Sequence, residues 1–557
     1  MFNAYPDSIG NRLSDLIETL NFTEFENAFS LFYILPSFFN NDLDRGFSII
    51  DYNINKELVY EKDIKDLKDM GIILKFDIVL NHLSVASPQF KDLVLNGAES
   101  EYENFFINWN KFWNGHGAMN EEGVIIPDKQ YLDILFMRKP GLPILKILFP
   151  GGKEIPYWNT FYQKLSYEKL KEEELVVISD IDSDSYITIC QIVNQCLENN
   201  GDLDQLNLEK HENHRDKILQ LVKSRPVYLG QMDLNARSPK VWQFYEETLS
   251  KLADYGCSIL RLDAFAYLHK EVGLSNFFNK PGTWEYLSRI EEMAKGKGLT
   301  ILPEIHAEYG SHIHEDVARA GYMIYDFFLP GLMIHTIEKK SSKALIKWIN
   351  DIINKDLRTI NMLGCHDGIP VLDLKGKRRN NVYLPGLLRD EEIEDIMDLI
   401  LRRGGRVKNI YDAEGNKISY YQVNATYFSA LGNNEEKLLL ARAIQMFMPG
   451  IPQVWYLDLF AGSNDYQAVD KAGQGGHKEI NRSNLSMEEV RYRMQFPIVQ
   501  DQLDIIRLRN THKAFDGNIE IRESKENELI LWWTNGDHFA QLTADLSGHT
   551  FSIKSSD

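Results

Sequence analysis

Short apolar runs rich in β-branched and aromatic residues alternate with longer amphipathic stretches over most of the chain. This alternation predicts an α/β fold, a (β/α)8 barrel of the TIM type. Helical patterns, for example at 239–256 and 283–298, separate the strand-like runs, and these runs lead into polar, ionisable residues. Such residues are expected where the carboxyl ends of barrel strands meet at one face. The apolar runs that most clearly predict strands lie at 31–39, 71–82, 257–267, 298–308 and 359–367.

Three regions interrupt the alternation. The first is rich in Gly, Pro, Asn and aromatic residues and predicts an irregular inserted domain; the second is highly charged and predicts a helical insert. The third carries basic patches and turn signals, and a final alternating segment predicts a small C-terminal β domain. The predicted limits are 1–82, 229–367 and 426–514 for the barrel and 515–557 for the β domain. The irregular inserted domain, or first excursion, is predicted at 83–164, the charged helical insert at 165–228, and the second excursion, which carries the basic patches, at 368–425.

The composition excludes several classes of protein. With 557 residues, 44% of them hydrophobic and 25% charged, the chain can form a large core and smaller domains. A net charge of −20 argues against a long nucleic acid as partner, because phosphate binding needs a basic surface. The four cysteines form no CxxC pair, and the sequence has neither a signal-peptide pattern nor a run long enough to span a membrane. We therefore expect a cytoplasmic protein with no membrane partner.

The segment RLDA at 261–264 places an acid at the end of an apolar strand. Burial of a carboxylate is costly unless the charge is paired. Arg261 lies two residues before Asp263 and therefore on the same face of a strand, where it can supply that pairing. A purely structural salt bridge is the alternative interpretation.

Three further strand ends carry ionisable groups. Glu304 follows one apolar run, and the alternative is that it belongs to the polar mouth of the barrel. His366 and Asp367 follow another run, where the Asp-Gly pair also predicts a turn. Asn81 and His82 end a third, and a structural histidine is the alternative there.

Acids at the ends of three strands of one barrel suit the chemistry of glycosidic bonds. One carboxylate attacks the anomeric carbon, and a second protonates the leaving oxygen and later deprotonates the acceptor. A third can bind ring hydroxyls and favour the cation-like transition state.

The motifs DIVLNH, RLDA, PEIH and HDG, in this order, resemble those of glycoside hydrolase family 13, the α-amylase family, and QMDLN at 231–235 resembles another segment of that family. A narrower resemblance is to the sucrose phosphorylase group. It covers nearly the whole chain except the charged insert, and DLDRGFSIIDY, RKPGLP, RLDAFAYLHKEVG, CHDGI and KEINRSN are among the segments that carry it.

The resemblance implies roles for individual residues. Asp263 would be the nucleophile, Glu304 the general acid/base and Asp367 the stabiliser of the transition state. Asp44 and Arg482 would form an ion pair that closes the pocket around a single glucosyl ring.

Eight further residues are implied to line the glucosyl site. His82 and His366 would hydrogen-bond ring hydroxyls. Phe47 and Phe161 would form apolar walls at the cation-like centre, with core packing as the alternative. The remaining four are Gln231, Arg261, Tyr267 and His306.

The sequence departs from the typical sucrose enzyme outside the glucosyl pocket. Arg138 and Lys139 lie in the loop that resembles the acceptor loop of the group, shifted from its usual arginine. The excursion after HDG looks closer to relatives that act on glucosylglycerate or sucrose 6′-phosphate. Basic residues cluster there, so we expect an acceptor with an anionic group, although inorganic phosphate accounts for some of them. They are Lys375, Lys377, Arg378, Arg379, Arg402, Arg403 and Arg406.

The resemblance thus implies a retaining glucoside phosphorylase that converts a small α-glucoside and inorganic phosphate into α-glucose 1-phosphate and the acceptor. Sucrose is the expected substrate, with glucosylglycerate and sucrose 6′-phosphate as the alternatives. No cofactor or metal ion is expected, and the protein is expected to be a monomer or a homodimer. Two alternatives stay open: a hydrolase or transglucosidase on the same barrel, and a non-catalytic member of the family. The presence of all three acids argues against the second.

Overall fold

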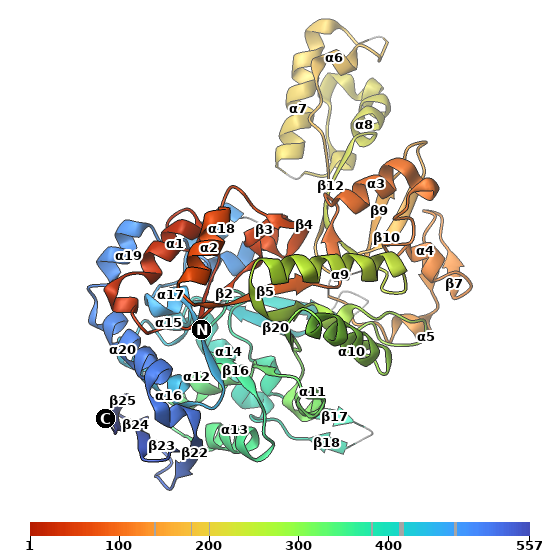
Figure 1. Cartoon of the computed structure of the whole chain (residues 1–557). Coiled ribbons are helices and arrows are strands. Elements are labelled where there is room, and N and C mark those ends of the chain that lie inside the picture. The colour runs from red at the N-terminus through yellow and green to blue at the C-terminus, as the bar shows by residue number, and fades with distance from the viewer. Residues whose placement is uncertain are drawn as a thin grey trace.

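The computed structural model describes residues 1–138, 141–179, 181–199, 201–379, 382–411, 417–472 and 476–556, with side chains except at 379, 408–411 and 417–422. Eight parallel strands form a nearly closed barrel (Figure 1), which confirms the predicted (β/α)8 fold. Their order in the sheet is β14-β13-β5-β2-β1-β21-β16-β15. The strands are β1 (Phe2–Ala4), β2 (Leu31–Ile34), β5 (Ile73–Val79), β13 (Cys257–Asp263), β14 (Thr300–Pro303), β15 (Ile324–Asp326), β16 (Thr359–Met362) and β21 (Ile451–Trp455).

Helices connect the strands and pack outside the barrel. The start and end of α9 (Pro239–Asp254) show how the sequence sets such boundaries: Pro239 is at its first position, and Gly256, with a φ of 92°, turns the chain into β13. The other outer helices are α1 (Leu13–Leu20), α2 (Glu61–Asp69), α10 (Gly282–Lys295), α11 (Ile313–Arg319), α12 (Leu329–Lys339), α13 (Lys343–Asn354), α16 (Glu435–Phe447), α17 (Tyr456–Leu459), α19 (Met487–Arg493) and α20 (Pro497–Thr511).

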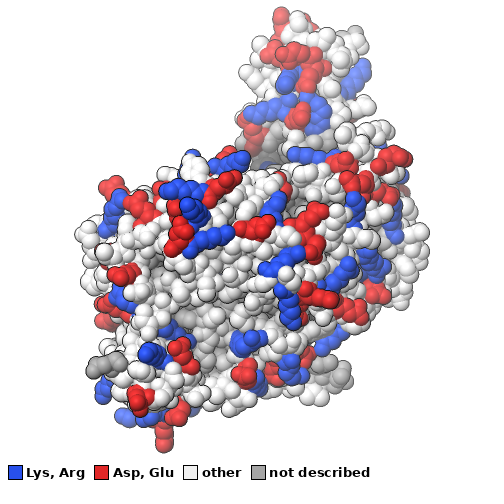
Figure 2. Space-filling model, viewed as in Figure 1, with Lys and Arg blue, Asp and Glu red and all other residues white. Residues whose placement is uncertain are grey.

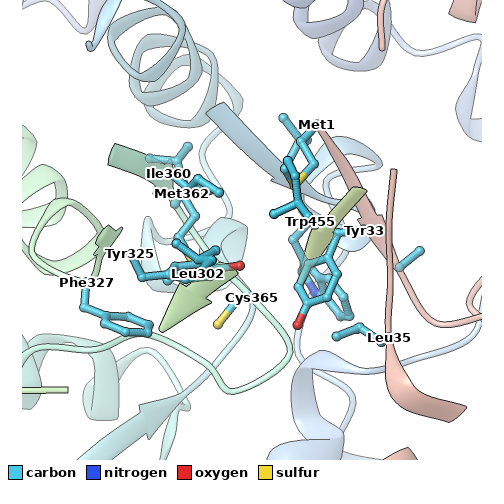
Figure 3. Packing of buried hydrophobic residues seen from close by; sticks show 14 of the residues in the cluster. Met1, Tyr33, Leu35, Leu302, Tyr325, Phe327, Ile360, Met362, Cys365 and Trp455 are labelled. Carbon is cyan, nitrogen blue, oxygen red and sulfur yellow. The ribbon is translucent and has the colours of Figure 1, made fainter. Parts of the chain in front are cut away.

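The barrel interior is filled by side chains. Figure 3 shows Tyr33 of β2, Leu302 of β14, Tyr325 of β15, Met362 of β16 and Trp455 of β21 among the buried residues of this core. All five are almost fully excluded from solvent. The interior therefore supports the groups at the strand ends rigidly instead of forming a pore.

The first excursion follows β5 and lies beside the mouth of the barrel. Its strand β6 (His82–Ser84) pairs with β12 (Pro226–Asp233), and β12 pairs with β11 (Gln163–Tyr167). Trp109, Trp113 and Trp158 form a separate small core there. The remaining elements are α3 (Pro88–Asn96), α4 (Trp109–Phe112), β7 (Gly117–Met119), β8 (Ile125–Pro127), α5 (Lys129–Leu132), β9 (Ile144–Leu148) and β10 (Glu154–Trp158).

The charged insert contains α6 (Glu172–Leu175), α7 (Tyr186–Glu198) and α8 (Arg215–Lys223) and stands away from the barrel (Figure 1). It has a hydrophobic core of its own, which includes Leu175, Ile189, Val193, Ile218 and Val222. The insert therefore buries its apolar side chains against one another and not against the barrel. The exact limits predicted for the domains stay predictions.

A hairpin of β3 (Phe39–Leu43) and β4 (Ser48–Ile54) carries the short helix η3 (Asp44–Gly46). Far along the chain, the short helix η11 (Gly476–Asn481) follows α18 (Tyr466–Ala472).

The second excursion and the C-terminal region complete the chain. The second excursion contains β17 (Lys377–Arg379), β18 (Val382–Leu384), α14 (Asp390–Arg402), β19 (Arg406–Tyr411) and β20 (Lys417–Asn424), and α15 (Tyr427–Ala430) follows it. The C-terminal antiparallel sheet consists of β22 (Asn518–Arg522), β23 (Glu528–Asn535), β24 (His538–Asp545) and β25 (Thr550–Ser555).

On the face shown in Figure 2, acidic and basic side chains are interspersed. Within the described part of the chain, no helix is long and apolar enough to cross a membrane.

Candidate active site

The three predicted acids lie at the carboxyl ends of barrel strands. Asp263 is the last residue of β13, Glu304 directly follows β14, and Asp367 lies in the turn after β16. Gly368 has a φ of 101°, a conformation that favours glycine, so HDG is a turn as well as an active-site motif. Ala264 has a φ of 52°, which is uncommon for a residue with a side chain and marks a constrained backbone beside Asp263.

Arg261 links the predicted nucleophile to the predicted acid/base. Its Nη1 donates to Asp263 Oδ1 at 2.9 Å, and its Nη2 lies 2.6 Å from Glu304 Oε1. Nη1 also donates to Asp77 Oδ1 at 2.7 Å, and the Tyr33 hydroxyl donates to the same carboxylate at 2.8 Å. The salt bridge considered as the alternative function of Arg261 therefore exists, and it holds two of the predicted acids at one guanidinium group.

The two acids at Arg261 differ in proton affinity. Burial and the neighbouring Glu304 raise the pKa of Asp263 well above its usual range. Burial also acts to raise the pKa of Glu304, but Arg261 and His306 outweigh it and lower that pKa to about 2. Because two buried carboxyls at one guanidinium group titrate as a pair, this arrangement of charges favours a proton on Asp263 over one on Glu304.

Two carboxylates and two cations meet on the other side of the site. Arg482 Nη1 donates to Asp44 Oδ1 at 3.0 Å, and Arg482 Nη2 lies 3.7 Å from Asp367 Oδ1. Lys478 Nζ donates to Asp367 Oδ1 at 2.7 Å and to Asp44 Oδ2 at 3.3 Å. Burial opposes ionisation, yet His366 and Lys478 keep the pKa of Asp367 well below its usual range. Lys478 and Arg482 lower the pKa of Asp44 to about 2 against the effect of burial.

The backbone that presents Asp44 is constrained. Asp44 and Arg45 both have positive φ angles, 49° and 47°. Gly46 follows with a φ of 116°, and a Cβ there would lie 2.2 Å from the backbone nitrogen of Ser37. Arg45 is held by an ion pair to Asp7 at 2.9 Å. This tight turn of η3 brings Asp44 to the site, and only glycine fits at its centre.

Phe47 connects several predicted residues of the pocket. Its ring stacks on His366 with 4.8 Å between centroids, and the Arg261 guanidinium lies 5.7 Å from its centroid. Its backbone oxygen lies 3.0 Å from His82 Nε2 and accepts a hydrogen bond from Gln231 Nε2 at 3.2 Å. Phe47 therefore packs against polar residues of the site and not only in the core.

Phe161 and Tyr267 form the opposite, aromatic side, with 5.1 Å between their ring centroids. Arg138 Nη1 donates to the Tyr267 hydroxyl at 3.0 Å, and its guanidinium lies 5.2 Å from the Phe161 ring. The predicted acceptor-loop arginine is thus in contact with predicted pocket residues. Lys139 lies outside the described residues, as does the side chain of Arg379.

His306 connects Glu304 to the second excursion. Its Nε2 lies 3.5 Å from Glu304 Oε1, and its Nδ1 lies 3.3 Å from Asp373 Oδ1. The imidazole stacks on Phe327 with 3.7 Å between centroids. Asp373 and Phe327 therefore fix the orientation of this histidine.

Two of the basic residues predicted for an anionic acceptor have other partners. Lys377 pairs with Glu308 at 2.8 Å, and Arg403 pairs with Glu338 at 3.0 Å. Arg406 is exposed. Arg403 is therefore a support of the second excursion, whereas Lys377 contacts the segment that follows Glu304.

A buried lysine joins the first excursion to the barrel. Lys270 Nζ lies 2.7 Å from Asp233 Oδ2 and donates to Asn81 Oδ1 at 2.9 Å and to the backbone oxygen of Tyr267 at 2.7 Å. Thr160 donates two more hydrogen bonds to the same aspartate. The motifs DIVLNH, QMDLN and RLDAFAYLHK are cross-linked at this point.

Several buried polar atoms of the site have no hydrogen-bond partner within the described part of the chain. Among them are His82 Nδ1 and Arg482 Nη2. An unsatisfied buried donor or acceptor costs roughly 1–3 kcal/mol, so such atoms at one site indicate a polar ligand. A ligand rich in hydroxyl groups would satisfy them.

Asp77, Lys478 and Asp373, which contact Arg261, Asp367 and His306, were not identified from the sequence. Asp77 is a carboxylate within an apolar strand run, which is a detectable signal, and it lies in DIVLNH itself. Lys478 lies in KEINRSN, four residues before Arg482. Asp373 had no such signal, because nothing local relates it to His306. Among the described residues, no group of three or more His, Cys, Asp or Glu is arranged to hold a metal ion.

Comparison with known proteins supplies the family. No protein-family model matches the chain. It is 51% identical to a sucrose 6(F)-phosphate phosphorylase of Ilumatobacter coccineus over 99% of this chain and 95% of the relative. It is 30% identical to a sucrose phosphorylase of Streptococcus mutans over 100% of this chain and 97% of that protein.

Solved structures agree. The crystal structure of sucrose 6F-phosphate phosphorylase from Thermoanaerobacter thermosaccharolyticum matches with a TM-score of 0.78 and 30% identity, covering 100% of this chain and 95% of that one. An α-amylase from H. orenii matches with a TM-score of 0.58 and 14% identity over 98% and 88% of the two chains, which shows the shared barrel fold. The chain belongs to the sucrose phosphorylase group of glycoside hydrolase family 13, the α-amylase family.

Proposed function

We propose that this protein is a retaining glucoside phosphorylase whose preferred donor is sucrose 6F-phosphate, which it converts with inorganic phosphate into α-glucose 1-phosphate and fructose 6-phosphate. The observation that carries the proposal is the pair of acids held at the two terminal nitrogens of Arg261. A retaining mechanism requires two carboxyls about 5–5.5 Å apart. The 51% identity to a sucrose 6(F)-phosphate phosphorylase supports the choice of donor.

In the first step, the Asp263 carboxylate attacks the anomeric carbon and forms a covalent glucosyl ester. The glycosidic carbon–oxygen bond breaks, and Glu304 transfers its proton to the leaving fructosyl oxygen. This step needs the proton on Glu304, whereas the protein's own charges favour it on Asp263. A glycosidic oxygen that binds Glu304 and separates it from Arg261 would reverse that preference.

In the second step, inorganic phosphate attacks the anomeric carbon from the face that the fructosyl group left. The ester bond to Asp263 breaks, and Glu304 accepts the phosphate proton. Two inversions give net retention. Phosphate requires at least one cation at its binding position, and Arg138 beside Tyr267 is the described candidate, with Lys139 next to it in the chain.

The other residues hold the glucosyl ring. Asp367 would stabilise the positive charge of the transition state, and Asp44 and Arg482 would bind the hydroxyls farthest from the anomeric carbon. The unpartnered nitrogens of His82 and Arg482 support a polyhydroxylated ligand at this position. The roles proposed for the remaining residues are hydrogen bonding by His366 and Gln231 and apolar or edge contacts by Phe47, Phe161, Tyr267 and His306.

Acceptor choice is tested by reverse synthesis from α-glucose 1-phosphate with fructose 6-phosphate, fructose, glycerate and glycerol in parallel. We expect the highest kcat/KM with fructose 6-phosphate. Arg138→Ala should lower phosphate release more with the phosphorylated than with the neutral sugar, while Lys513→Ala, in the C-terminal region, should change neither. A neutral acceptor with the highest kcat/KM and an unchanged ranking in Arg138→Ala would exclude the anionic acceptor.

A hydrolase on the same site is the alternative. It would release glucose from the covalent intermediate at a rate independent of phosphate. Measuring glucose and glucose 1-phosphate with and without phosphate separates the two activities. A phosphorylase conserves the energy of the glycosidic bond in glucose 1-phosphate, which benefits a cell when the product forms inside it. We therefore propose a cytoplasmic location and a monomer or homodimer.

A further inference from the structure

Lys478 occupies a central place in the candidate site that the family motifs do not assign. Its Nζ lies 2.7 Å from Asp367 Oδ1 and 3.3 Å from Asp44 Oδ2. The lysine comes from η11, Asp367 from the turn after β16, and Asp44 from η3, so three distant segments meet at one ammonium group. Its side chain is 20% exposed.

Arg482 alone does not hold these two carboxylates. Its Nη1 is shared between Asp44 and Glu479, at 3.0 and 3.3 Å, and its Nη2 lies 3.7 Å from Asp367. The contact from Lys478 to Asp367 is a full ångström shorter, 2.7 against 3.7 Å. Among the described residues, the Asp367 carboxylate would without Lys478 keep only the adjacent His366 at 3.1 Å and the Arg482 guanidinium at 3.7 Å.

The charges around Lys478 are mutually compensating. Asp367 and Asp44 face it, Arg482 lies on the same side, and burial disfavours its charged form; the two carboxylates outweigh both effects and raise its pKa above the usual range. Two carboxylates that approach one sugar ring repel each other, and a cation between them removes that repulsion. A charge-assisted hydrogen bond to each also restricts their orientation.

We infer that Lys478 is a positioning residue of the glucosyl site, which sets the separation and ionisation of Asp44 and Asp367 so that both carboxylates accept hydroxyls of one ring. The inference rests on the proposed function only in that a glucosyl ring binds at these acids. It does not depend on the acceptor or on phosphate.

The test uses α-D-glucosyl fluoride, because fluoride leaves with little help from an acid and its release reports on the donor site whichever acceptor follows. Lys478→Met removes the charge and keeps the length, Lys478→Gln keeps a donor, and Lys478→Arg keeps the charge. Lys339→Met is the matched control, because Lys339 forms an exposed ion pair with Asp395 far from the site. Circular dichroism and thermal unfolding establish that each variant is folded.

We expect Lys478→Met and Lys478→Gln to lower kcat/KM for fluoride release by about 30-fold or more, since a charge-assisted contact to the stabilising carboxylate is lost. Lys478→Arg should stay within about fivefold of the wild type, and Lys339→Met should be unchanged. Removing the cation lets the pKa of Asp367 rise.

A second substrate distinguishes positioning from general support of the fold. The substrate 4-deoxy-α-D-glucosyl fluoride lacks the hydroxyl proposed to bind Asp44, so kcat/KM of the wild type should fall relative to α-D-glucosyl fluoride. The same change of substrate should lower kcat/KM of Lys478→Met much less, because the missing hydroxyl and the missing cation affect one contact. The inference is overturned if Lys478→Met releases fluoride within twofold of the wild type, or if the deoxy penalty is the same in both proteins. Fluoride release without phosphate dependence would instead contradict the proposed phosphorylase and leave the role of Lys478 measurable.

Discussion

At the scale of single residues, the site is organised around shared counterions. Arg261 contacts Asp263, Glu304 and Asp77, while Lys478 and Arg482 together contact Asp44 and Asp367. Asp263 and Glu304 share one guanidinium group yet differ in proton affinity, because burial and the neighbouring Glu304 raise the pKa of Asp263 whereas Arg261 and His306 lower that of Glu304. This division lets one barrel mouth hold acids with different tasks.

A first prediction separates the two acids at Arg261. Asp263→Asn should lower turnover of every α-glucosyl donor by about 10⁴-fold or more, because no covalent ester can form. Glu304→Gln should lower turnover of the phosphorylated disaccharide by at least about 10²-fold, yet still release fluoride from α-glucosyl fluoride in a rapid burst. Stopped-flow and steady-state fluoride measurements check both variants.

The same two variants test which acid is the nucleophile and which is the general acid/base. Both variants should unfold at temperatures near that of the wild type, since each substitution preserves the shape of the side chain. If Asp263→Asn gives a burst and Glu304→Gln gives none, the two roles are exchanged.

At the scale of elements, the excursions are fastened to the barrel by buried polar contacts. Lys270 lies downstream of β13 and reaches Asp233 at the end of β12 and Asn81 after β5. Burial lowers the pKa of Lys270 and opposes ionisation of Asp233, but the pairing keeps the pKa of Asp233 below its usual range. The pair therefore fixes β12, and with it Gln231, relative to the predicted nucleophile on β13.

A second prediction follows at this scale. Lys270→Met should destabilise the protein by about 3–5 kcal/mol, because it leaves the Asp233 carboxylate buried and without its cation. The double variant Lys270→Met with Asp233→Asn should recover part of the loss. Urea unfolding followed by tryptophan fluorescence measures both, and Lys280→Met, which loses an exposed ion pair with Asp316, is the control. If Lys270→Met lowers the free energy of unfolding by less than about 1 kcal/mol, the prediction is wrong, because that is the contribution of an exposed ion pair.

At the scale of the whole molecule, the helical insert and the barrel have separate hydrophobic cores. The two ends of the insert meet in an antiparallel ladder, in which Tyr167 pairs with Pro226. The chain can therefore leave and re-enter the first excursion at one point. Such an arrangement allows the insert to form or be lost without repacking the barrel.

A third prediction tests that independence. Replacement of residues 168–225 by Asn-Gly, a two-residue hairpin turn, should leave kcat/KM for the donor within about twofold and the barrel folded. Enzyme kinetics, thermal unfolding and the mass in solution by light scattering are the measurements. A loss of activity in a folded variant would assign the insert to the site, and a change of mass would assign it to a subunit contact.

The sequence by itself determined the barrel and the order of its motifs. Strands and helices follow from local periodicity, and in a parallel barrel every strand ends at the same face. Asp263, Glu304 and Asp367 could therefore be placed at one barrel mouth from their positions after apolar runs, and the family resemblance added Asp44 and Arg482.

Only the tertiary structure decided which charges meet. Lys478 and Asp44 are 434 positions apart, and the contact from Asp373 to His306 spans 67. Neither contact follows from periodicity, because each depends on how loops fold over the strand ends and on which buried charge most needs a counterion. The separate core of the insert was likewise decided in three dimensions, since scattered apolar positions in a charged segment do not specify what they pack against.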